Sequence, residues 1–396
     1  MIVSQARQHR RQAGLNIVAD ENMRGVSALF SGYGQVVLVD GRNLCREQLL
    51  AADVLLVRSI TTVDKTLLDG TAVRFVGTAT SGLEHIDRRY LSSANIAFAH
   101  AQGANANSVL EYVLSAIACS GDYLEQLLCG AEVGIVGHGH VGRRLADCFR
   151  GLGIGVCIYD PWLEGFSDST GLDEVLKCRV LCLHPELTRQ APWPSYHLLS
   201  CATLAQLPEN TLLINASRGA VVDNCALLAM LKVRPDICCV LDVWEGEPLI
   251  DRQLLEYVDL ATPHIAGYSL DSKLMATRML ADTLPAALGI EPAAPQTKRD
   301  DDIEMAATIR LAVADGNTEA IDILRQLLTA RYDIRRDDHA LRQALAQADK
   351  AAAGPAFDAL RRHYPERREL RNSKVVGVDK LPMSWLQALG VVRADG

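Results

Sequence analysis

The stretch EVGIVGHGHVG at residues 132–142 decides the fold of this chain. An apolar run leads into Gly137, Gly139 and Gly142, and the following RRLADCFRGLG has the pattern of a helix. In such a strand–turn–helix, the first glycine permits a tight turn, the second lets backbone amides approach a pyrophosphate, and the third lets the helix pack on the strand. The anion would lie at the helix N-terminus, beside His140 and Val141, where amides and helix dipole favour negative charge.

An acidic residue follows this turn at the next strand end. Asp160 closes the run GVCIYD at 155–160, at roughly the 20-residue distance typical of dinucleotide-binding folds. A carboxylate there accepts hydrogen bonds from ribose hydroxyls and repels a 2′-phosphate, which favours NAD over NADP. The alternative is a glycine turn followed by a solvated aspartate.

Strand-like runs alternate with helix-length segments along most of the chain. Before the glycine turn they lie at 15–22, 36–40, 52–59 and 72–82, and after it at 155–160, 180–187, 210–219, 237–248 and 258–267. This alternation is typical of parallel sheets with helices on both faces. We therefore expect an α/β protein with two doubly wound parallel-sheet domains, Rossmann or flavodoxin-like. A long helix near 107–120, with Asn107 or Ser108 as its N-cap, would join them.

The composition changes near residue 292, where PAAPQTKRDDD reads as a linker. Charged residues are denser beyond it than before it, and the tail contains helical patterns at 317–329 and 338–361 and a strand-like run at 375–378. We expect a smaller α+β domain there. We expect a frayed N-terminal extension at 1–14. It would be followed by a substrate-binding domain at 15–108 and 269–290, an NAD-binding domain at 109–268, and a C-terminal domain at 291–396.

Charge and cysteine usage exclude several classes of protein. The net charge of −8 gives no overall basic footprint for nucleic acid or an anionic membrane. No run of about 18 apolar residues occurs, so no membrane span is expected. The 11 cysteines include no CxxC pair, which favours reduced, buried cysteines of a cytoplasmic protein. No metal site is expected, because His138 and His140 lack a third ligand at suitable spacing.

Three strand-end loops each supply one strongly polar residue: Arg218 in NASRG, Glu247 in EGEP and His264 in TPHIAG. Ligands of open α/β sheets bind beyond the carboxyl ends of the strands, so these residues can converge. A histidine can take the proton of a hydroxyl while a hydride leaves, a carboxylate can hold its ring, and a guanidinium can clamp a substrate carboxylate. Individually, a surface ion pair, a capping acid and a turn histidine would explain them equally well.

With these residues in place, the chain resembles the D-isomer-specific 2-hydroxyacid dehydrogenases from Leu15 onward. The resemblance rests on ADENM at 19–23, VRSIT at 57–61, FVGTATSGLEHID at 75–87, GIVGHGHVG at 134–142, NASRGAVVDN at 215–224, LDVWEGEP at 241–248 and HIAGY at 264–268. The tail runs YDIRRDDHALR at 332–342 and FDALRRHYPERREL at 357–370 resemble the extra C-terminal domain of one branch, which mediates homodimerisation. That branch oxidises 4-phospho-D-erythronate to 2-oxo-3-hydroxy-4-phosphobutanoate with NAD, a step of pyridoxal 5′-phosphate (vitamin B6) synthesis.

The resemblance also implies roles for individual residues. Arg218, Glu247 and His264 would be catalytic, with His264 as the proton acceptor. Residues expected to touch the substrate are Arg58, Ser59, Thr80, Ser81, Gly82 and Tyr268, with Arg58 as the first candidate for its phosphate. Those expected at the cofactor are Gly137, Gly139, His140, Val141, Gly142, Asp160, Pro185, Ala216, Ser217, Arg218, Asp242 and Gly267.

One position departs from the family pattern. The chain has His184-Pro185-Glu186 where the family usually has Thr-Pro, so Pro185 replaces a hydroxyl that could bond the cofactor. Two other functions remain open at this point. One is a related dehydrogenase acting on a substrate such as 3-phosphoglycerate, against which the tail argues. The other is a dinucleotide-sensing binding protein of the same fold, against which the presence of Arg218, Glu247 and His264 argues.

Overall fold

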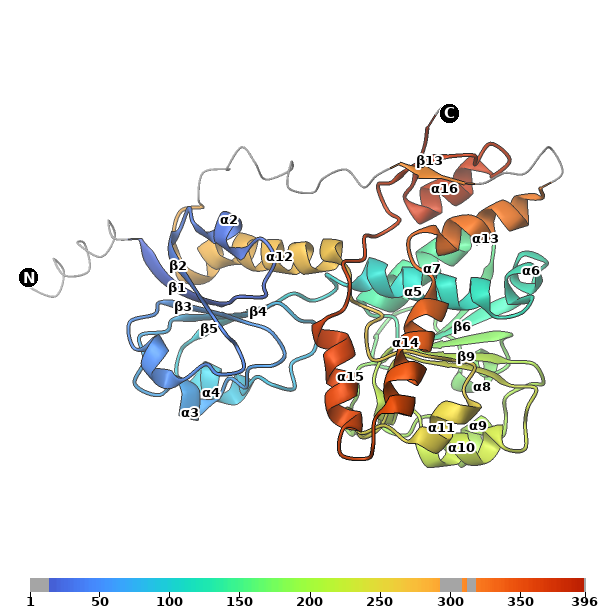
Figure 1. Cartoon of the computed structure of the whole chain (residues 1–396), viewed down its shortest axis with the longest axis horizontal. Helices are drawn as coiled ribbons and strands as arrows, with labels where there is room; N and C mark the ends of the chain where they lie inside the picture. Colours follow the sequence, from blue (N-terminus) through green and yellow to red (C-terminus); the bar gives the residue numbers. More distant parts are fainter. Residues whose placement is uncertain (1–13, 293–307, 312–317, 395–396) are drawn as a thin grey trace, which may run out of the picture. The chain divides into compact units, whose positions relative to one another are not determined.

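The computed structural model describes residues 14–292, 308–311 and 318–394 (Figure 1). The predicted N-terminal extension, apart from Gly14, and the predicted linker, apart from Pro292, lie outside these residues. The chain divides into two compact units. Unit 1 comprises Met1–Asn105 and Leu270–Glu304, and unit 2 comprises Ala106–Ser269 and Met305–Gly396.

Unit 1 is built on a five-stranded parallel sheet of order β2-β1-β3-β4-β5. Its strands are β1 (Leu15–Asp20), β2 (Gly34–Val39), β3 (Val54–Val57), β4 (Phe75–Thr78) and β5 (Ala97–His100). Its helices are α2 (Val26–Phe30), η1 (Arg46–Leu49), α3 (Lys65–Leu68), α4 (Arg88–Ser93) and α12 (Leu270–Leu288). The central strands are apolar without alternation because both faces of the sheet are covered, by a core that includes α2 and α12 and by a core that includes α3 and α4.

Unit 2 is built on a six-stranded parallel sheet of order β11-β10-β9-β8-β6-β7. Its strands are β6 (Glu132–Val136), β7 (Gly155–Tyr159), β8 (Val180–Leu183), β9 (Leu212–Asn215), β10 (Cys238–Leu241) and β11 (Leu260–Ala261). Its helices before the tail are α5 (Ala106–Cys119), α6 (Tyr123–Leu128), α7 (His140–Gly151), α8 (Leu172–Val175), α9 (Cys201–Leu204), α10 (Asn224–Leu231) and α11 (Arg252–Tyr257), with the turn η2 (Gly219–Val221). The order reverses between β6 and β8, which is where doubly wound sheets bind ligands.

The C-terminal region adds a small parallel sheet and four helices to unit 2 (Figure 1). The sheet consists of β12 (Ile309–Arg310), β13 (Lys374–Val376) and β14 (Val392–Arg393), and the helices are α13 (Ala320–Ala330), α14 (Ile334–Gln347), α15 (Ala353–Arg362) and α16 (Met383–Leu389). Apolar residues of α13 and α16 share a core with α5 and α7, whereas those of α14 and α15 share a core with α10 and α11. The predicted C-terminal domain thus packs as part of the same compact unit as the predicted NAD-binding domain.

The α/β fold predicted from the alternation is confirmed, with local differences. Helix α5 begins at Ala106, so Asn107 and Ser108 lie inside it and are not its N-cap. The single helix expected at 338–361 is wrong: α14 ends at Gln347 and α15 begins at Ala353. The break follows from Asp349, whose carboxylate accepts hydrogen bonds from the amides of Ala351 and Ala352 and so favours a turn. Strand β5 was not predicted, because its alanine-rich sequence is a weak strand former.

The cysteine prediction is correct in one part and wrong in another. All 11 cysteines are free. Only Cys148, Cys178, Cys182 and Cys239 are buried, however, while four others are exposed on helices and loops.

Among the described residues, no helix is long and apolar enough to cross a membrane.

Candidate active site

The glycine turn has the close approaches that its spacing predicts. Gly137 has φ +90°, and a Cβ there would lie 2.6 Å from the Pro185 nitrogen. A Cβ at Gly142 would lie 2.0 Å from the Gly137 carbonyl oxygen, so helix α7 packs directly on the turn. Gly139, the N-cap of α7, has no atom within 4 Å of its Cβ position. The turn is therefore tight where the protein packs on itself and open at the helix N-terminus, the kind of position that favours an anion.

Asp160 lies beside this turn, at the end of β7. Its Oδ2 accepts a hydrogen bond from the His138 amide at 2.7 Å, and its Oδ1 accepts one from the Trp162 amide at 3.2 Å. The His138 ring is buried and stacks on Phe166 at 4.5 Å between centroids. Burial, with Arg143 and Arg150, lowers the pKa of His138, so it is a neutral packing residue at neutral pH. The exposed Gly139 and His140, the half-buried Val141 and the carboxylate of Asp160 fit a dinucleotide.

The departure at Pro185 has a structural counterpart. Because Pro185 lies against Gly137, the 184–185 segment forms the wall of the turn. The His184 amide donates to the Val136 carbonyl at 2.8 Å, which continues the sheet past β8. Burial lowers the pKa of the His184 ring to about 3, so this side chain is a neutral wall residue.

The NASRG loop after β9 is folded around the buried side chain of Asn215. Its Oδ1 accepts from the amide and the hydroxyl of Ser217, at 3.1 and 2.8 Å, and its Nδ2 donates to the Arg218 carbonyl at 3.0 Å. Arg218 is half-buried with extended backbone, and its NH1 donates to the Ser217 carbonyl at 2.8 Å. Sequence reasoning missed Asn215, although a buried asparagine at a strand end is typical of such side-chain-closed turns.

The Arg218 loop packs directly on the loop that carries Glu247. A Cβ at Gly219 would lie 2.0 Å from the Trp244 carbonyl carbon, so only glycine permits this approach. The Asn224 amide donates to Glu245 Oε2 at 2.9 Å, and the Glu245 amide donates to Asn224 Oδ1 at 3.2 Å. These contacts fix two of the three predicted catalytic loops against each other.

Glu247 and His264 are in direct contact. His264 Nδ1 lies 2.7 Å from Glu247 Oε2, and Glu247 Oε1 accepts from the Trp244 amide at 2.8 Å. Burial alone would raise the pKa of Glu247, but the hydrogen bond and charge of His264, the Trp244 amide and the charge of Arg361 outweigh it and lower the pKa. Glu247 is therefore ionised at neutral pH and holds one nitrogen of a ring that is about one-third exposed (32%).

The position of His264 depends on Asp242, which is buried at the end of β10. Asp242 Oδ1 accepts from the Thr262 hydroxyl at 2.6 Å and from the Ile265 amide at 2.7 Å, and its Oδ2 accepts from the Ala266 amide at 3.0 Å. The His264 amide donates to the Asp242 carbonyl at 2.7 Å. His264 has φ +57°, a left-handed conformation that these bonds hold in place. Asp242, predicted at the cofactor, thus organises the turn that carries His264.

Ala216 and Gly267 are half-buried backbone positions in these loops. Tyr268 is also half-buried, and its ring meets Tyr364 edge to face at 5.8 Å. Arg361 NH2 donates to the Tyr268 hydroxyl at 3.4 Å. Sequence reasoning missed Arg361, because nothing in a charge-dense tail distinguishes one arginine from its neighbours.

The remaining predicted substrate residues belong to unit 1. Thr80 follows β4, and its hydroxyl donates to the Gly82 carbonyl at 2.9 Å. The Ser81 hydroxyl donates to Asn105 Oδ1 at 3.1 Å. Arg58 and Ser59 follow β3 and are half-buried and exposed, respectively. All of these lie past the carboxyl ends of adjacent strands, so they share one edge of the unit 1 sheet.

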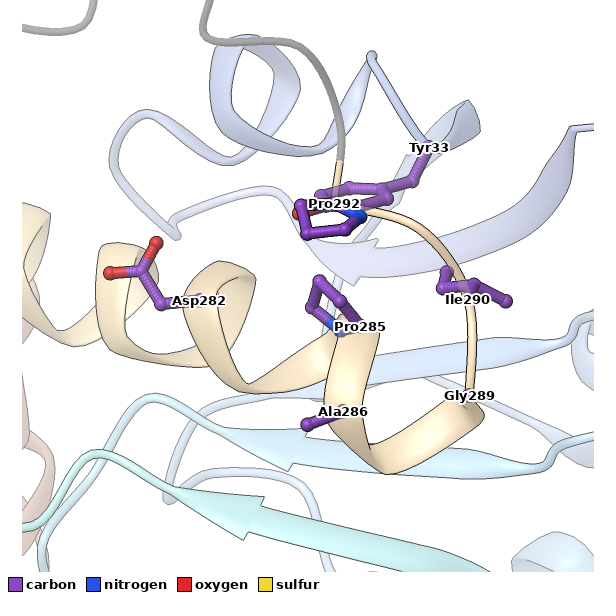
Figure 2. Close-up of a pocket in the computed structure, with 7 residues that line it drawn as sticks. All are labelled: Tyr33, Asp282, Pro285, Ala286, Gly289, Ile290 and Pro292. Atoms are coloured by element: carbon purple, nitrogen blue, oxygen red, sulfur yellow. The ribbon is translucent and has the colours of Figure 1, made fainter.

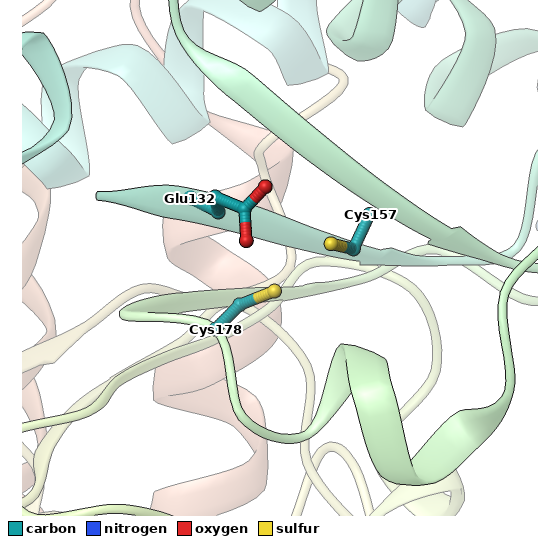
Figure 3. A group of neighbouring side chains, drawn as sticks. All are labelled: Glu132, Cys157 and Cys178. Carbon is teal, nitrogen blue, oxygen red and sulfur yellow. The ribbon is translucent and has the colours of Figure 1, made fainter. Parts of the chain in front are cut away.

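Within the part of the chain that the structure describes, two side-chain groups have the composition of metal sites. Glu132, Cys157 and Cys178 approach one another near the amino ends of β6 and β7 (Figure 3). Burial raises the pKa of both thiols, which disfavours the thiolates that a metal needs. In the second group, His197 Nε2 lies 2.8 Å from Glu245 and Nδ1 lies 3.7 Å from Asp223. Its two nitrogens face different carboxylates, so the ring bridges them as a structural link between loops.

A surface pocket in unit 1 lies away from the predicted site. Tyr33, which precedes β2, lines it together with Asp282, Pro285 and Ala286 of α12 (Figure 2). It therefore adjoins the amino end of β2, whereas the candidate ligand-binding residues follow the carboxyl ends of strands.

Comparison with known proteins places this geometry in context. The family described as "D-isomer specific 2-hydroxyacid dehydrogenase, NAD binding domain" matches residues 113–266, and a domain of unknown function matches residues 305–390. A protein of Stutzerimonas stutzeri named erythronate-4-phosphate dehydrogenase is 43% identical over 362 residues, covering 90% of this chain and 93% of its own. A protein of the same name from Cellvibrio japonicus is 41% identical over 382 residues, covering 95% and 99%.

Solved structures share the fold. An NAD⁺-bound 3-phosphoglycerate dehydrogenase of Entamoeba histolytica superposes with a TM-score of 0.59 at 21% identity, covering 72% of this chain and 99% of its own. A D-lactate dehydrogenase of Aquifex aeolicus in complex with NAD and lactic acid superposes with a TM-score of 0.55 at 21% identity, covering 68% and 95%.

Proposed function

The chain belongs to the erythronate-4-phosphate dehydrogenases, within the D-isomer-specific 2-hydroxyacid dehydrogenase family, and from that premise we propose its substrate and the roles of its residues. It is an NAD-dependent dehydrogenase. The proposed reaction is oxidation of 4-phospho-D-erythronate to 2-oxo-3-hydroxy-4-phosphobutanoate. The product would feed the synthesis of pyridoxal 5′-phosphate.

The cofactor would be held by the open glycine turn and the residues around it. The amides at the start of α7 would bind the pyrophosphate, and Asp160 would accept hydrogen bonds from the ribose. The loops that contain Pro185, Ala216, Ser217, Asp242 and Gly267 would adjoin the rest of the dinucleotide. When bound, NAD supplies the acceptor for the hydride that leaves C2 of the substrate.

The catalytic residues would handle the proton and the substrate carboxylate. With its hydrogen on Nδ1, His264 would donate to Glu247 and keep a lone pair on Nε2 for the proton of the C2 hydroxyl. Glu247 then stabilises the imidazolium that forms. Arg218 would bind the carboxylate at C1 through its planar guanidinium, which also withdraws charge from the reacting carbon.

The observation that carries this proposal is the 2.7 Å contact between His264 and Glu247, at the same carboxyl edge of the six-stranded sheet as the open glycine turn. The test measures NADH fluorescence with 4-phospho-D-erythronate, 3-phosphoglycerate and glycerate side by side. The proposed substrate should have the highest kcat/KM. His264→Ala should lower its kcat by about 10²–10⁴-fold, the usual contribution of a general base. Near-normal turnover by that variant, or a preference for 3-phosphoglycerate, would contradict the proposal.

We further propose that the protein is a cytoplasmic homodimer, assembled through the C-terminal region. Met383 of α16 and Val392 of β14 are each 56% exposed, and β14 is an edge strand of its sheet. The free cysteines fit a reducing compartment. Analytical ultracentrifugation should give twice the chain mass, and Val392→Glu should shift the protein toward monomer. A monomer mass for the wild-type chain at micromolar concentration would contradict the assembly, and cell fractionation tests the compartment.

A further inference from the structure

Arg361 brings a cation from the C-terminal region to the candidate active site. It occupies the last turn of α15, inside residues 305–390, which match a family described as a domain of unknown function. Its NH2 donates to the Tyr268 hydroxyl at 3.4 Å. Tyr268 lies four residues after His264, in the turn that Asp242 organises.

The Arg361 guanidinium is largely shielded and incompletely bonded. Its side chain is 26% exposed, and its Nε is buried without a hydrogen-bond partner among the described residues. Its ion pair with Asp358 is long, at 3.9 Å. Burial opposes its charge, but Tyr268 and Glu247 outweigh burial and raise the pKa of Arg361. A guanidinium that is shielded from water and does not use all of its N–H donors is suited to bind an anion.

Helix α15 holds this side chain on a rigid element. Phe357 is fully buried in the core of unit 2. At the start of the helix, a Cβ at Gly354 would lie 3.1 Å from Leu249 and 3.4 Å from Pro248, the residues that directly follow Glu247. The helix therefore packs on the Glu247 loop at one end and reaches Tyr268 at the other, which fixes Arg361 relative to the catalytic pair.

We propose that Arg361 binds the phosphate of the substrate and makes the enzyme selective for a phosphorylated 2-hydroxy acid. This inference rests on the proposed function. Arg218 is assigned to the carboxylate at C1, and the dianionic phosphate at C4 needs a cation of its own. A single guanidinium can donate two parallel hydrogen bonds to phosphate oxygens. On this view, the C-terminal region contributes directly to substrate recognition in addition to any role in assembly.

The test compares substrates that differ only in the phosphate. We would measure kcat/KM for 4-phospho-D-erythronate and for D-erythronate with wild type, Arg361→Gln and Arg361→Lys. Arg362→Gln is the matched control, because it removes an equal charge from an exposed neighbour on the same helix. We expect Arg361→Gln to lower the ratio of kcat/KM for the phosphorylated substrate to kcat/KM for D-erythronate by about 10²-fold. Arg361→Lys should retain part of the preference, and Arg362→Gln all of it.

Two results would overturn the proposal. Equal losses on both substrates would mean that Arg361 acts by positioning Glu247 and His264, and an unchanged preference for the phosphorylated substrate would mean that it does not contact the phosphate. Thermal melting and NAD binding check that each variant folds. If Arg361→Gln does not fold, Arg361→Lys replaces it, and kcat/KM for 4-phospho-D-erythronate is again compared with kcat/KM for D-erythronate. If wild type does not oxidise 4-phospho-D-erythronate, the proposed function fails. Arg361 is then tested separately by comparing kcat/KM for 3-phosphoglycerate with kcat/KM for glycerate.

Discussion

His264 Nδ1 lies 2.7 Å from Glu247 Oε2, and the two residues reach this contact from different strand-end loops. Each loop is independently fixed. Asp242 holds the His264 turn through the amides of Ile265 and Ala266, and the Trp244 amide holds the other carboxylate oxygen of Glu247. The ring therefore presents its second nitrogen in one orientation before any substrate binds, which is the preorganisation that general-base catalysis requires.

Glu247→Gln should separate the role of the carboxylate charge from that of its shape. Glutamine can still accept a hydrogen bond but cannot stabilise an imidazolium. We expect kcat to fall by about 10²–10⁴-fold, the range of general-base contributions, while NAD affinity stays within twofold. Steady-state kinetics and titration of NAD by protein fluorescence check this. A kcat within threefold of wild type would show that the charge of Glu247 is not used in the reaction.

Alanine at two glycines of the turn should have different effects. Gly142→Ala would place a methyl group 2.0 Å from the Gly137 carbonyl oxygen, so the protein should lose both thermal stability and NAD affinity. Gly139→Ala meets no protein atom within 4 Å. It should keep the wild-type melting temperature and weaken NAD binding alone, because the methyl occupies space that the pyrophosphate needs. Melting curves with and without NAD measure both effects, and a Gly139→Ala protein that binds NAD normally would contradict the assignment of this turn.

Sequence reasoning succeeded where a local pattern carries the information. The glycine spacing at 137–142 and the apolar strands follow from short-range sterics and burial, and both appear in the structure as expected. The sequence also singles out polar residues at strand ends, because parallel strands deliver their carboxyl ends to one edge. Glu247 and His264 illustrate this, since neither is unusual by itself and their contact follows from the topology.

What sequence reasoning missed depends on contacts between distant segments. Asn215 looks like an ordinary strand-end residue until its bond to the Ser217 amide is known. Asp242 was predicted at the cofactor, but its bonds to the amides of Ile265 and Ala266 were not. Arg361 is one of several arginines in its segment, and only the packing of α15 on the Glu247 loop distinguishes it. The composition change near residue 292 also does not tell which surfaces share a core, so the packing of the C-terminal region with the predicted NAD-binding domain in one compact unit could not be read from it.

Asp242→Asn tests whether this residue supports the catalytic turn in the absence of cofactor. The amide nitrogen of asparagine would face a backbone N–H of Ile265 or Ala266, so one buried donor loses its acceptor. We expect a loss of about 1–3 kcal/mol in the free energy of unfolding and a lower kcat, measured by urea denaturation and steady-state kinetics. Asp251→Asn is the control, because Asp251 accepts the Gln253 amide at an exposed helix start. A fully stable Asp242→Asn protein would limit Asp242 to a cofactor role.

A second buried carboxylate links α5 to the C-terminal region. Glu111 Oε1 accepts from Asn107 Nδ2 at 3.0 Å and from the Leu370 amide at 2.7 Å, and Glu369 binds the same Asn107 nitrogen at 2.9 Å. Glu111 Oε2 is buried without a hydrogen-bond partner among the described residues. Burial, followed by the charge of Glu369, raises the pKa of Glu111 from 4.5 to about 8.

Glu111→Gln should therefore stabilise the protein in a pH-dependent way. Between the unfolded pKa of 4.5 and the folded pKa of about 8, the folded protein binds a proton that the unfolded chain has released. This group's contribution to the free energy of unfolding thus falls as pH rises through that window, by up to about 1.4 kcal/mol per pH unit. Glutamine keeps the Oε1 acceptor and does not ionise. The free energy of unfolding of Glu111→Gln, relative to wild type, should therefore increase from pH 5 to 8 and then level off. Urea denaturation across pH 5–9 measures this, with the exposed Glu132→Gln as the control. A stability difference between Glu111→Gln and wild type that is constant with pH would show that Glu111 is ionised in the folded protein and that its neighbours, Arg367 included, compensate for its burial.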